Sequence, residues 1–484
     1  MKIPSSPIKV HRESLSFKPD QTKVITRFFQ PNKERQKNII QRILKLSNNE
    51  VDQILKLTTA NFSLRHENIK RIFKVNYEKL KIEIDLSLER RLLIGSYFTM
   101  EYAIETAALI NPSIVPHPNQ EDIEKDEKRV ILSFRAVGEG HMSSIVFREG
   151  IIKKNGCLVI EQDNTKLELG KINDDFLYDK KDFVLKLKEI NSYESVKSIF
   201  NNLLEKFSYA ELNESTLRYI KKYKNDKSFN SEAIETLIWF AKSNFEIDFD
   251  EELDLSGRVL FPRSKGEIKA LEDARFVKFQ EMDGSPKYYA TYTAYDGRNI
   301  LPQLIETKNF YRFKIITMMG SGSQNKGMAL FPEKIKGKYV MLSRNDNENL
   351  YLMYSNRINY WEKPILLRKP TFYWEFFQIG NNGSPLKTED GWLVLTHGVG
   401  PVRTYCIGAI LLDLDNPNKI IKATREPILF PLENERNGYV PNVVYSCGSI
   451  IHQDYLIMPY AISDTRSGVA KFNMKELLNC MERC

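Results

Sequence analysis

The spacing of hydrophobic residues predicts helices in the first hundred residues. Between Gln30 and Leu57, apolar side chains recur at helical intervals, and the polar run Ser47-Asn48-Asn49 interrupts them. Glu50 follows this break and suits the first turn of a second helix, because acidic side chains stabilise helix N-termini. The stretch from Leu86 to Leu109 continues as a long, largely buried helix. Residues 1–106 are therefore predicted to form an N-terminal helical extension.

The pattern then changes to short runs typical of strands. In residues 107–157, β-branched and aromatic residues lie on both sides of a Gly-rich turn at 138–140, which predicts a β-hairpin. Residues 158–256 return to helical spacing and are rich in lysine. From Gly257 onward the chain is almost wholly strand-like.

A unit of three strands recurs in the strand-rich parts. Its second strand reads V-I-L-S-F-R-A near residue 130, Y-Y-A-T-Y-T-A near 290, Y-V-M-L-S-R near 340, W-L-V-L-T-H-G near 394 and Y-L-I-M-P-Y-A near 457. The last three steps are each about 50 to 60 residues, close to the blade period of a β-propeller. The first step is longer, and removing residues 158–256 brings it near the same spacing.

The recurrence predicts a mainly β fold, a five-bladed β-propeller with two helical additions. The chain divides into the N-terminal helical extension (1–106), a first blade (107–157), a helical insertion between blades one and two (158–256) and the remaining blades (257–484). The alternative fold, a sandwich of two sheets, would need no such recurrence.

Composition and charge limit the classes of function that the chain can have. Of 484 residues, 42% are hydrophobic, which is enough for a sizeable core. The 71 basic and 63 acidic residues leave a net charge of only +8, so no nucleic-acid-binding stripe is required. Residues 180–228 are rich in lysine, but acidic residues are interspersed among them. This favours a solvated helical face, with nucleic-acid binding as the alternative.

Several other classes lack their sequence signals. The five cysteines are scattered without a CxxC pair, and there is no HExxH motif and no EF-hand loop. We therefore expect no disulfide framework and no metal site. The first residues contain no apolar core of signal-peptide length, and no 18-residue apolar run follows. We expect a cytoplasmic protein that does not bind a membrane.

The stretch A-L-E-D-A-R-F at residues 270–276 is the leading candidate for chemistry. It places Glu272 and Asp273 directly before Arg275, where an apolar strand begins. An acid beside a cation on a rigid strand suits catalysis, although a surface ion pair would show the same residues. In a propeller the inner strands meet at a central channel. Asp273 could therefore share a pocket with residues distant in sequence, namely Arg135, Arg298, His397 and Asp464.

Three further positions have both a functional and a structural interpretation. The loop Gly320–Gly327 lacks the G-K-[ST] ending of a nucleotide-binding loop, yet Lys326 could present a charge to an anion. His397 ends an apolar strand, where a buried structural histidine is the alternative. Asp464 lies at the equivalent point of the last unit, where a turn-forming aspartate is the alternative. No G-x-S-x-G motif is present, which argues against a serine hydrolase.

Read in order, the motifs resemble those of glycoside hydrolase family 130. They are N-P-S-I-V, F-R-A-V-G, L-E-D-A-R, D-G-R-N, L-F-P-E-K-I-K-G-K-Y-V-M-L-S-R, I-G-N-N-G-S-P-L-K-T-E-D-G-W-L-V-L-T-H-G-V, G-A-I-L-L-D-L-D-N-P, V-P-N-V-V-Y-S-C-G and Y-A-I-S-D-T. The likeness covers residues 107–150 and 257–475. It implies a five-bladed propeller that cleaves β-mannosides with inversion, mostly by phosphorolysis and in some branches by hydrolysis.

The resemblance implies a role for each matching residue. Asp273 matches the catalytic general acid in a motif usually written E-D-P-R, with Ala274 in place of the proline. It would protonate the glycosidic oxygen through a hydroxyl of the bound mannose, unlike the usual pair of carboxylates. Phosphate would then attack the anomeric carbon and give mannose 1-phosphate.

The resemblance also implies the binding residues. Phosphate-binding positions are Arg298, Asn299, Lys326, Gln378 and His397, and substrate-binding positions are Asn111, Arg135 and Asp464. Gln378 departs from the family, which commonly has lysine there, so the affinity for phosphate could be lower. No cofactor is implied, because inorganic phosphate is a co-substrate.

Two other functions remain open at this point. A β-mannoside hydrolase would need a carboxylate to activate water, and Glu139 and Glu375 are the candidates. A non-catalytic carbohydrate-binding propeller is the other alternative. Tyr373, Trp374 and Phe376 could stack on sugars near the mouth of the pocket. The helical additions could narrow that pocket or build a contact between copies of the chain in a homo-oligomer.

Overall fold

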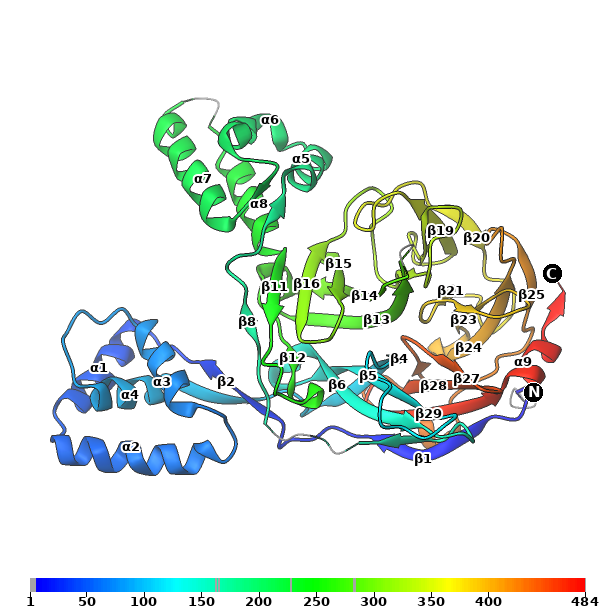
Figure 1. The fold of residues 1–484 in the computed structure, drawn as a ribbon, viewed down its shortest axis with the longest axis horizontal. Helices are drawn as coiled ribbons and strands as arrows, with labels where there is room; N and C mark the ends of the chain where they lie inside the picture. The colour runs from blue at the N-terminus through cyan, green and yellow to red at the C-terminus, as the bar shows by residue number, and fades with distance from the viewer. Residues whose placement is uncertain (1–5, 162, 164–165, 227–228, 282–283, 484) are drawn as a thin grey trace.

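The computed structural model describes residues 6–161, 163, 166–226, 229–281 and 284–483. It shows a rounded body of strands with two groups of helices beside it (Figure 1). The predicted mainly β fold with helical additions is therefore confirmed. Residues 1 and 484, the ends of the predicted division, and residue 228, the end of the lysine-rich stretch, lie outside the described residues.

Each of the five recurring second strands lies between antiparallel partners, as the three-strand unit predicts. The first set contains β4 (Ala108–Pro116), β5 (Lys128–Val137), β6 (Ser143–Ile152), β7 (Leu158–Ile160) and β12 (Val259–Leu260). The second contains β13 (Ala270–Gln280), β14 (Pro286–Tyr295), β15 (Ile300–Thr307), β16 (Arg312–Thr317), β11 (Phe245–Asp248) and β8 (Lys171–Ile172). A parallel contact between Ala270 and Ser143 joins these two sets into one 11-stranded sheet.

Three further sheets complete the body of strands. The third set contains β17 (Ala329–Leu330), β18 (Tyr339–Ser343), β19 (Leu350–Ser355) and β20 (Ile365–Arg368). The fourth contains β21 (Gln378–Asn381), β22 (Leu386–Lys387), β23 (Trp392–Val399), β24 (Tyr405–Leu412), β25 (Ile420–Ala423) and β30 (Glu482–Arg483). The fifth contains β26 (Val444–Tyr445), β27 (Ile450–His452), β28 (Tyr455–Ile462), β29 (Arg466–Asn473) and β1 (His11–Phe17), and α9 (Met474–Cys480) follows it.

The core lies between neighbouring sets of strands. Buried clusters join the first set to the second, the second to the third, the third to the fourth and the fourth to the fifth. A further cluster packs Ile457 and Val469 of the fifth set against Leu132 and Phe134 of the first. Since burying such side chains is the main favourable term in folding, these contacts fix the order of the sets around the body.

The N-terminal residues contain the predicted helices. They are α1 (Lys33–Leu44), α2 (Asn48–Ser63), α3 (Ile69–Glu78) and α4 (Leu88–Tyr97). The expected break between α1 and α2 is confirmed: the Ser47 hydroxyl accepts from the Glu50 N–H, and the Glu50 carboxylate accepts from the Ser47 N–H. This capping box satisfies two backbone donors that a helix start leaves unpaired.

The same residues also contain strands that the helical pattern did not predict. The single helix expected from Leu86 to Leu109 is wrong, because α4 ends at Tyr97 and β3 (Thr99–Ala103) pairs with β2 (Val24–Phe28). The residues after Tyr97 fit either period, and tertiary pairing decides between them. β1 pairs with β29, about 450 residues later in the chain.

The insertion forms a small helical body with its own core. Its helices are α5 (Lys180–Glu189), α6 (Tyr193–Val196), α7 (Tyr209–Tyr223) and α8 (Ser231–Lys242), with a short strand pair formed by β9 (Tyr178–Asp179) and β10 (Lys206–Phe207). It is not wholly helical, since β8 and β11 at its two ends extend the second set of strands. Both helical groups lie outside the body of strands, next to β2, β8 and β11 (Figure 1). No helix in the described ranges has the length and apolar character needed to cross a membrane.

Candidate active site

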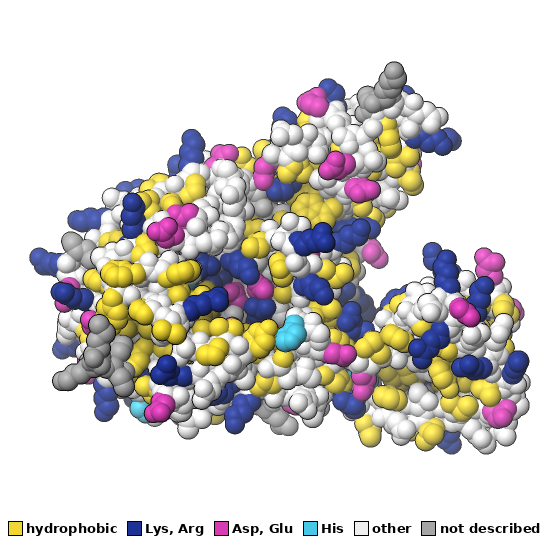
Figure 2. Space-filling model, turned by 180° about the vertical axis from the view of Figure 1, so that it is seen from behind, with side chains coloured by type: hydrophobic (Ala, Val, Ile, Leu, Met, Phe, Trp, Pro, Cys, Tyr) yellow, Lys and Arg dark blue, Asp and Glu magenta, His cyan; other side chains and the backbone are white. Residues whose placement is uncertain are grey.

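The candidate side chains gather at one end of the strands. In four sets, the first strand begins beside the hairpin that joins the second and third strands, as the pairs Ala108–Val137, Ala270–Tyr295, Gln378–Val399 and Val444–Ile462 show. Most candidates lie at or within a few residues of these ends: Asn111, Arg135, Asp273, Arg298, Asn299, Gln378, His397 and Asp464. Lys326 lies three residues before β17 of the third set. In the view from behind, acidic and basic side chains gather in a hollow near the middle of the larger lobe (Figure 2).

A β-bulge sets the orientation of Asp273. The pairing of β13 with β14 shifts between Glu272 and Arg275, and Asp273 has a left-handed φ of 57°. Bulges re-aim side chains, and a left-handed backbone is uncommon for residues other than glycine. The bulge therefore interrupts the alternation of the strand at the acid itself.

Hydrogen bonds and nearby cations keep Asp273 ionised. Asn111 Nδ2 donates to Asp273 Oδ1 at 2.5 Å, and Arg135 Nη1 lies 3.8 Å from the same oxygen. Burial raises the pKa of Asp273, but Arg135, Arg275 and the bond from Asn111 outweigh it, and the pKa is held below its usual value. Asp273 is therefore a carboxylate at neutral pH.

Glu272, the neighbour of Asp273, holds two cations in place. Its Oε1 lies 2.9 Å from Arg135 Nη2, and its Oε2 lies 2.5 Å from Lys326 Nζ. The adjacent acids thus share Arg135, and Glu272 ties this predicted substrate-binding residue to a predicted phosphate-binding one. The sequence identified Glu272 only as the neighbour of Asp273.

Asp464 is a second half-buried acid near Asp273. Burial, together with the negative charge of Asp273, raises the pKa of Asp464 to about 6, and Arg135 and Arg403 oppose this shift. Asp464 has a left-handed φ of 49° and follows Ser463, which has a φ of 46°. The site therefore contains two carboxyl groups whose surroundings push their pKa values apart.

His397 is neutral and is paired with Arg344. The His397 side chain is fully buried, and its Nε2 accepts from Arg344 Nη1 at 3.0 Å. Burial, then the charges of Arg344 and Arg275, lower the pKa of His397 well below its usual value. Gly380 makes this pair possible, because a Cβ there would lie 2.6 Å from His397 Cε1 and 2.7 Å from Arg344 Cδ.

Arg275 and Tyr445 connect His397 to Asp273. Arg275 Nη2 donates to the Tyr445 hydroxyl at 2.7 Å, and Arg275 Nη1 donates to the backbone oxygen of Asp273 at 2.9 Å. The ring centroids of Tyr445 and His397 lie 4.9 Å apart. Arg344, Arg275 and Tyr445 were not among the site residues predicted from the sequence. The sequence could have indicated Arg344, because it occupies the same position at the end of its second strand, Y-V-M-L-S-R, as His397 does in W-L-V-L-T-H.

The remaining phosphate candidates differ in exposure. Gln378 is buried at the start of β21. Arg298 and Asn299 are exposed in the β14–β15 hairpin, where the Asp296 carboxylate accepts from the N–H of both residues. These two share the strand end with Asp273 but stand outside the buried part of the cluster.

Buried polar atoms without a protein partner add binding capacity to the cluster. Among the described residues they include Asn111 Oδ1, Arg344 Nε and both amide atoms of Asn381 and Asn382. Asn382 adjoins the cluster, because its backbone oxygen accepts from Arg275 Nε at 2.6 Å. Buried polar groups are normally hydrogen-bonded, so these atoms can bind a polar ligand.

The suggestions for Glu375 and Trp374 are wrong, whereas Tyr373 and Phe376 are exposed and their stacking on sugars stays a prediction. The Glu375 carboxylate is fully buried and accepts from Arg368 and from the N–H of Thr371 and Phe372, so it serves the local fold rather than activating water. Trp374 is buried against Gly398 and Gly408 and cannot stack on a sugar.

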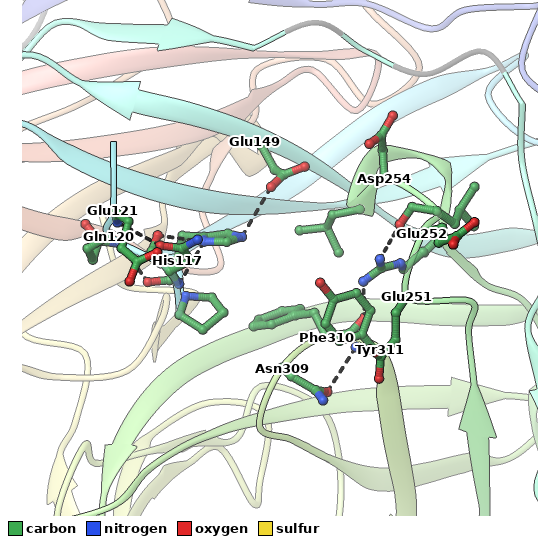
Figure 3. A pocket seen from close by; sticks show the side chains of 15 residues that line it. His117, Gln120, Glu121, Glu149, Glu251, Glu252, Asp254, Asn309, Phe310 and Tyr311 are labelled. Atoms are coloured by element: carbon green, nitrogen blue, oxygen red, sulfur yellow. Dashed lines mark hydrogen bonds and ion pairs between the residues drawn. The ribbon is translucent and has the colours of Figure 1, made fainter. Parts of the chain in front are cut away.

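A cavity at the other end of these strands contains none of the candidates. It has a volume of about 640 Å³ and lies beyond the end of β4 and the β15–β16 turn (Figure 3). Its acidic lining includes Glu149, Glu251 and Asp254. Within the described ranges, no group of three or more His, Cys, Asp or Glu residues is placed to hold a metal ion.

Comparison with known proteins points to one family. A family model described as β-1,4-mannooligosaccharide phosphorylase (Glyco_hydro_130) matches residues 177–483. A 1,2-β-oligomannan phosphorylase from Thermoanaerobacter sp. (strain X514) is 37% identical over 244 residues, covering 49% of this chain and 79% of its own. A β-1,2-mannobiose phosphorylase from the same organism is 36% identical over 240 residues, covering 48% and 76%. The solved structure of β-1,2-mannobiose phosphorylase from Listeria innocua has a TM-score of 0.45 and 22% identity, covering 78% of this chain and 92% of that one.

Proposed function

Because the chain belongs to glycoside hydrolase family 130, we propose that it cleaves β-mannosides by phosphorolysis and releases mannose 1-phosphate. The observation that carries the proposal is the cluster around Asp273, in which a bulge presents the carboxylate and cations from several sets of strands surround it. Relatives named as mannoside phosphorylases support the choice of phosphate as co-substrate. They include enzymes for β-1,2 and β-1,4 linkages, so we propose the β-mannoside class.

The mannosyl unit would lie against Asn111, Arg135 and Asp464, with its scissile bond near Asp273. In the proposed step, a mannose hydroxyl gives its proton to the glycosidic oxygen and takes one from Asp273. The bond from the anomeric carbon to that oxygen breaks, and a phosphate oxygen bonds to the carbon from the opposite face, with inversion. Phosphate also prepares the acid, because a nearby anion raises the pKa of Asp273 and favours its protonated form.

Arg344 would supply the positive charge that Gln378 lacks. The Lys326 charge is largely balanced by Glu272, and His397 is neutral. Arg344 has an unpartnered buried Nε and lies beside Gly380, two residues from Gln378. A guanidinium suits a phosphate dianion, because it donates two parallel hydrogen bonds as well as charge.

We also infer that the five sets of strands form a five-bladed β-propeller. The repeated unit and the core clusters between successive sets, including one between the fifth and the first, support this fold. Such closure brings the starts of the first strands to a common centre.

Hydrolysis is the second candidate reaction. With Glu375 ruled out, Glu139 is the remaining candidate for the carboxylate that would activate water. This residue lies in the turn that joins β5 and β6, and it is exposed. The choice between the two reactions is tested by incubating the full chain with β-1,2- and β-1,4-mannobiose, with and without phosphate. Phosphorolysis predicts sugar release only with phosphate, together with mannose 1-phosphate. Equal release of mannose without phosphate would overturn it.

A further inference from the structure

Two exposed rings lie together at the end of the strands that carries Asp273. His141 belongs to the turn between β5 and β6, and Tyr439 lies in the segment before β26. Their ring centroids are 5.5 Å apart, with 30° between the ring planes. Tyr439 is 73% exposed, so burial in the core does not account for its position.

Both rings flank the residues proposed to hold the mannosyl unit. The Tyr439 N–H donates to the Thr465 hydroxyl at 3.2 Å, and Thr465 directly follows Asp464. The Thr465 backbone oxygen accepts from the Leu109 N–H, two residues before Asn111. The turn that carries His141 begins at Gly138, three residues after Arg135.

The backbone holds each ring in a fixed place. His141 has a left-handed φ of 57°, and the Tyr102 hydroxyl donates to the Glu139 backbone oxygen at 2.6 Å within the same turn. Before Tyr439, a Cβ on Gly438 would lie 2.2 Å from the Ser463 backbone oxygen, so only glycine fits this approach. A histidine in this conformation persists where its surroundings over-determine it, which is typical of functional sites.

We propose that His141 and Tyr439 form a stacking platform for the sugars on the leaving-group side of a β-mannooligosaccharide. This inference rests on the proposed function. The side of the site that contains Asn381, Asn382 and Arg275 is buried, whereas the two rings lie on an exposed side, next to the Asp464 turn. A tyrosine presents a large, rigid, amphipathic face to a pyranose ring at low entropic cost.

The platform predicts a preference for longer substrates. The test compares kcat/KM with phosphate for the mannobiose that the enzyme turns over and for the mannotetraose of the same linkage. Tyr439→Ala should lower the ratio of tetraose to biose about three- to tenfold, the range expected for one lost aromatic contact. Tyr439→Phe should restore the ratio. His141→Asn should also lower it, and asparagine tolerates the left-handed backbone.

A matched control separates this effect from the loss of any exposed ring. Tyr97 on α4 is 49% exposed, and Tyr97→Ala should leave the ratio unchanged. An unchanged ratio in Tyr439→Ala, or equal losses on both substrates, would overturn the platform.

A binding measurement separates this proposal from the proposed function. Titration calorimetry of mannotetraose, with wild type and Tyr439→Ala, reports the platform even if no phosphorolysis occurs. If the variant binds mannotetraose more weakly but wild type shows no turnover, phosphorolysis is contradicted and the platform is supported. If wild type shows turnover but both proteins bind mannotetraose equally, the platform is contradicted and phosphorolysis is supported.

Discussion

Two neighbouring acids in one strand do different work in this molecule. Glu272 pairs with Arg135 and Lys326, whereas Asp273 is presented by the bulge and accepts from Asn111. The motif alone could predict that an acid in this stretch is functional. It could not predict which cations each acid meets, because those come from strands far away in the sequence.

Glu272 should matter for stability as well as for activity. Glu272→Gln leaves two cations without their carboxylate, and we expect it to lower the free energy of unfolding by about 2 kcal/mol. Chemical denaturation measures this change. The control is Glu194→Gln, which removes an exposed pair with Lys197 and should cost far less. Equal effects of the two variants would contradict the role given to Glu272.

Asp464 should make stability depend on pH. Its pKa of about 6 lies above its ordinary 3.8, so the folded state binds the proton more tightly than the unfolded state does. The free energy of unfolding therefore falls as the pH rises from the ordinary pKa to the raised one. Asp464→Asn removes this cost and keeps the left-handed backbone. We expect it to stabilise the protein by about 2 kcal/mol at pH 7.5 and much less at pH 4. Thermal unfolding at both values measures this, and an equal change at both would contradict it.

At the scale of elements, the insertion supports the loop that carries Lys326. The Asp182 carboxylate on α5 accepts from Asn359 Nδ2 at 3.0 Å and pairs with Arg357. The Asn359 backbone oxygen in turn accepts from the Met319 N–H, at the start of the loop, at 2.8 Å. A second contact joins Glu189 Oε2 to the Gly320 N–H at 3.0 Å. These bonds link α5 to the backbone that positions Lys326.

Loosening this support should weaken phosphate binding from a distance. Asp182→Asn should raise the KM for phosphate about three- to tenfold, because the loop loses a charge-assisted contact. Steady-state kinetics with varied phosphate measures it. Glu214→Gln on α7 breaks only a surface pair with Arg218 and should change nothing. An unchanged KM in Asp182→Asn would show that α5 does not position the loop.

Whether a segment forms a helix or a strand was predictable where neighbouring residues determine it. Which strands pair with each other was not predictable. The second strands and the start of α2 follow from alternation and capping, which neighbouring residues determine. The pairing of β1 with β29 and the end of α4 depend on contacts between distant segments. Likewise, the order of the motifs predicts roles for Asp273, Asn111 and Arg135, but Tyr445 emerges only from its side-chain contacts.

At the scale of the whole molecule, the helical groups are additions beside a body of strands. The curated relatives align with about half of this chain, and both helical groups lie outside the strands (Figure 1). The two groups have separate cores, around Ile94 and Phe98 in one and around Phe183 and Phe240 in the other. A contact between copies of the chain through these helices stays a prediction.

Asp273 is proposed to supply the proton for an inverting phosphorolysis. The most direct test is NMR of the products from the mannobiose substrate and phosphate, with wild type and Asp273→Asn. Asparagine keeps the left-handed backbone and can still accept from Asn111. Wild type should form α-mannose 1-phosphate, and the variant should form it about 10²- to 10⁴-fold more slowly. Formation of the β-anomer, or an Asp273→Asn variant as fast as wild type, would contradict the account.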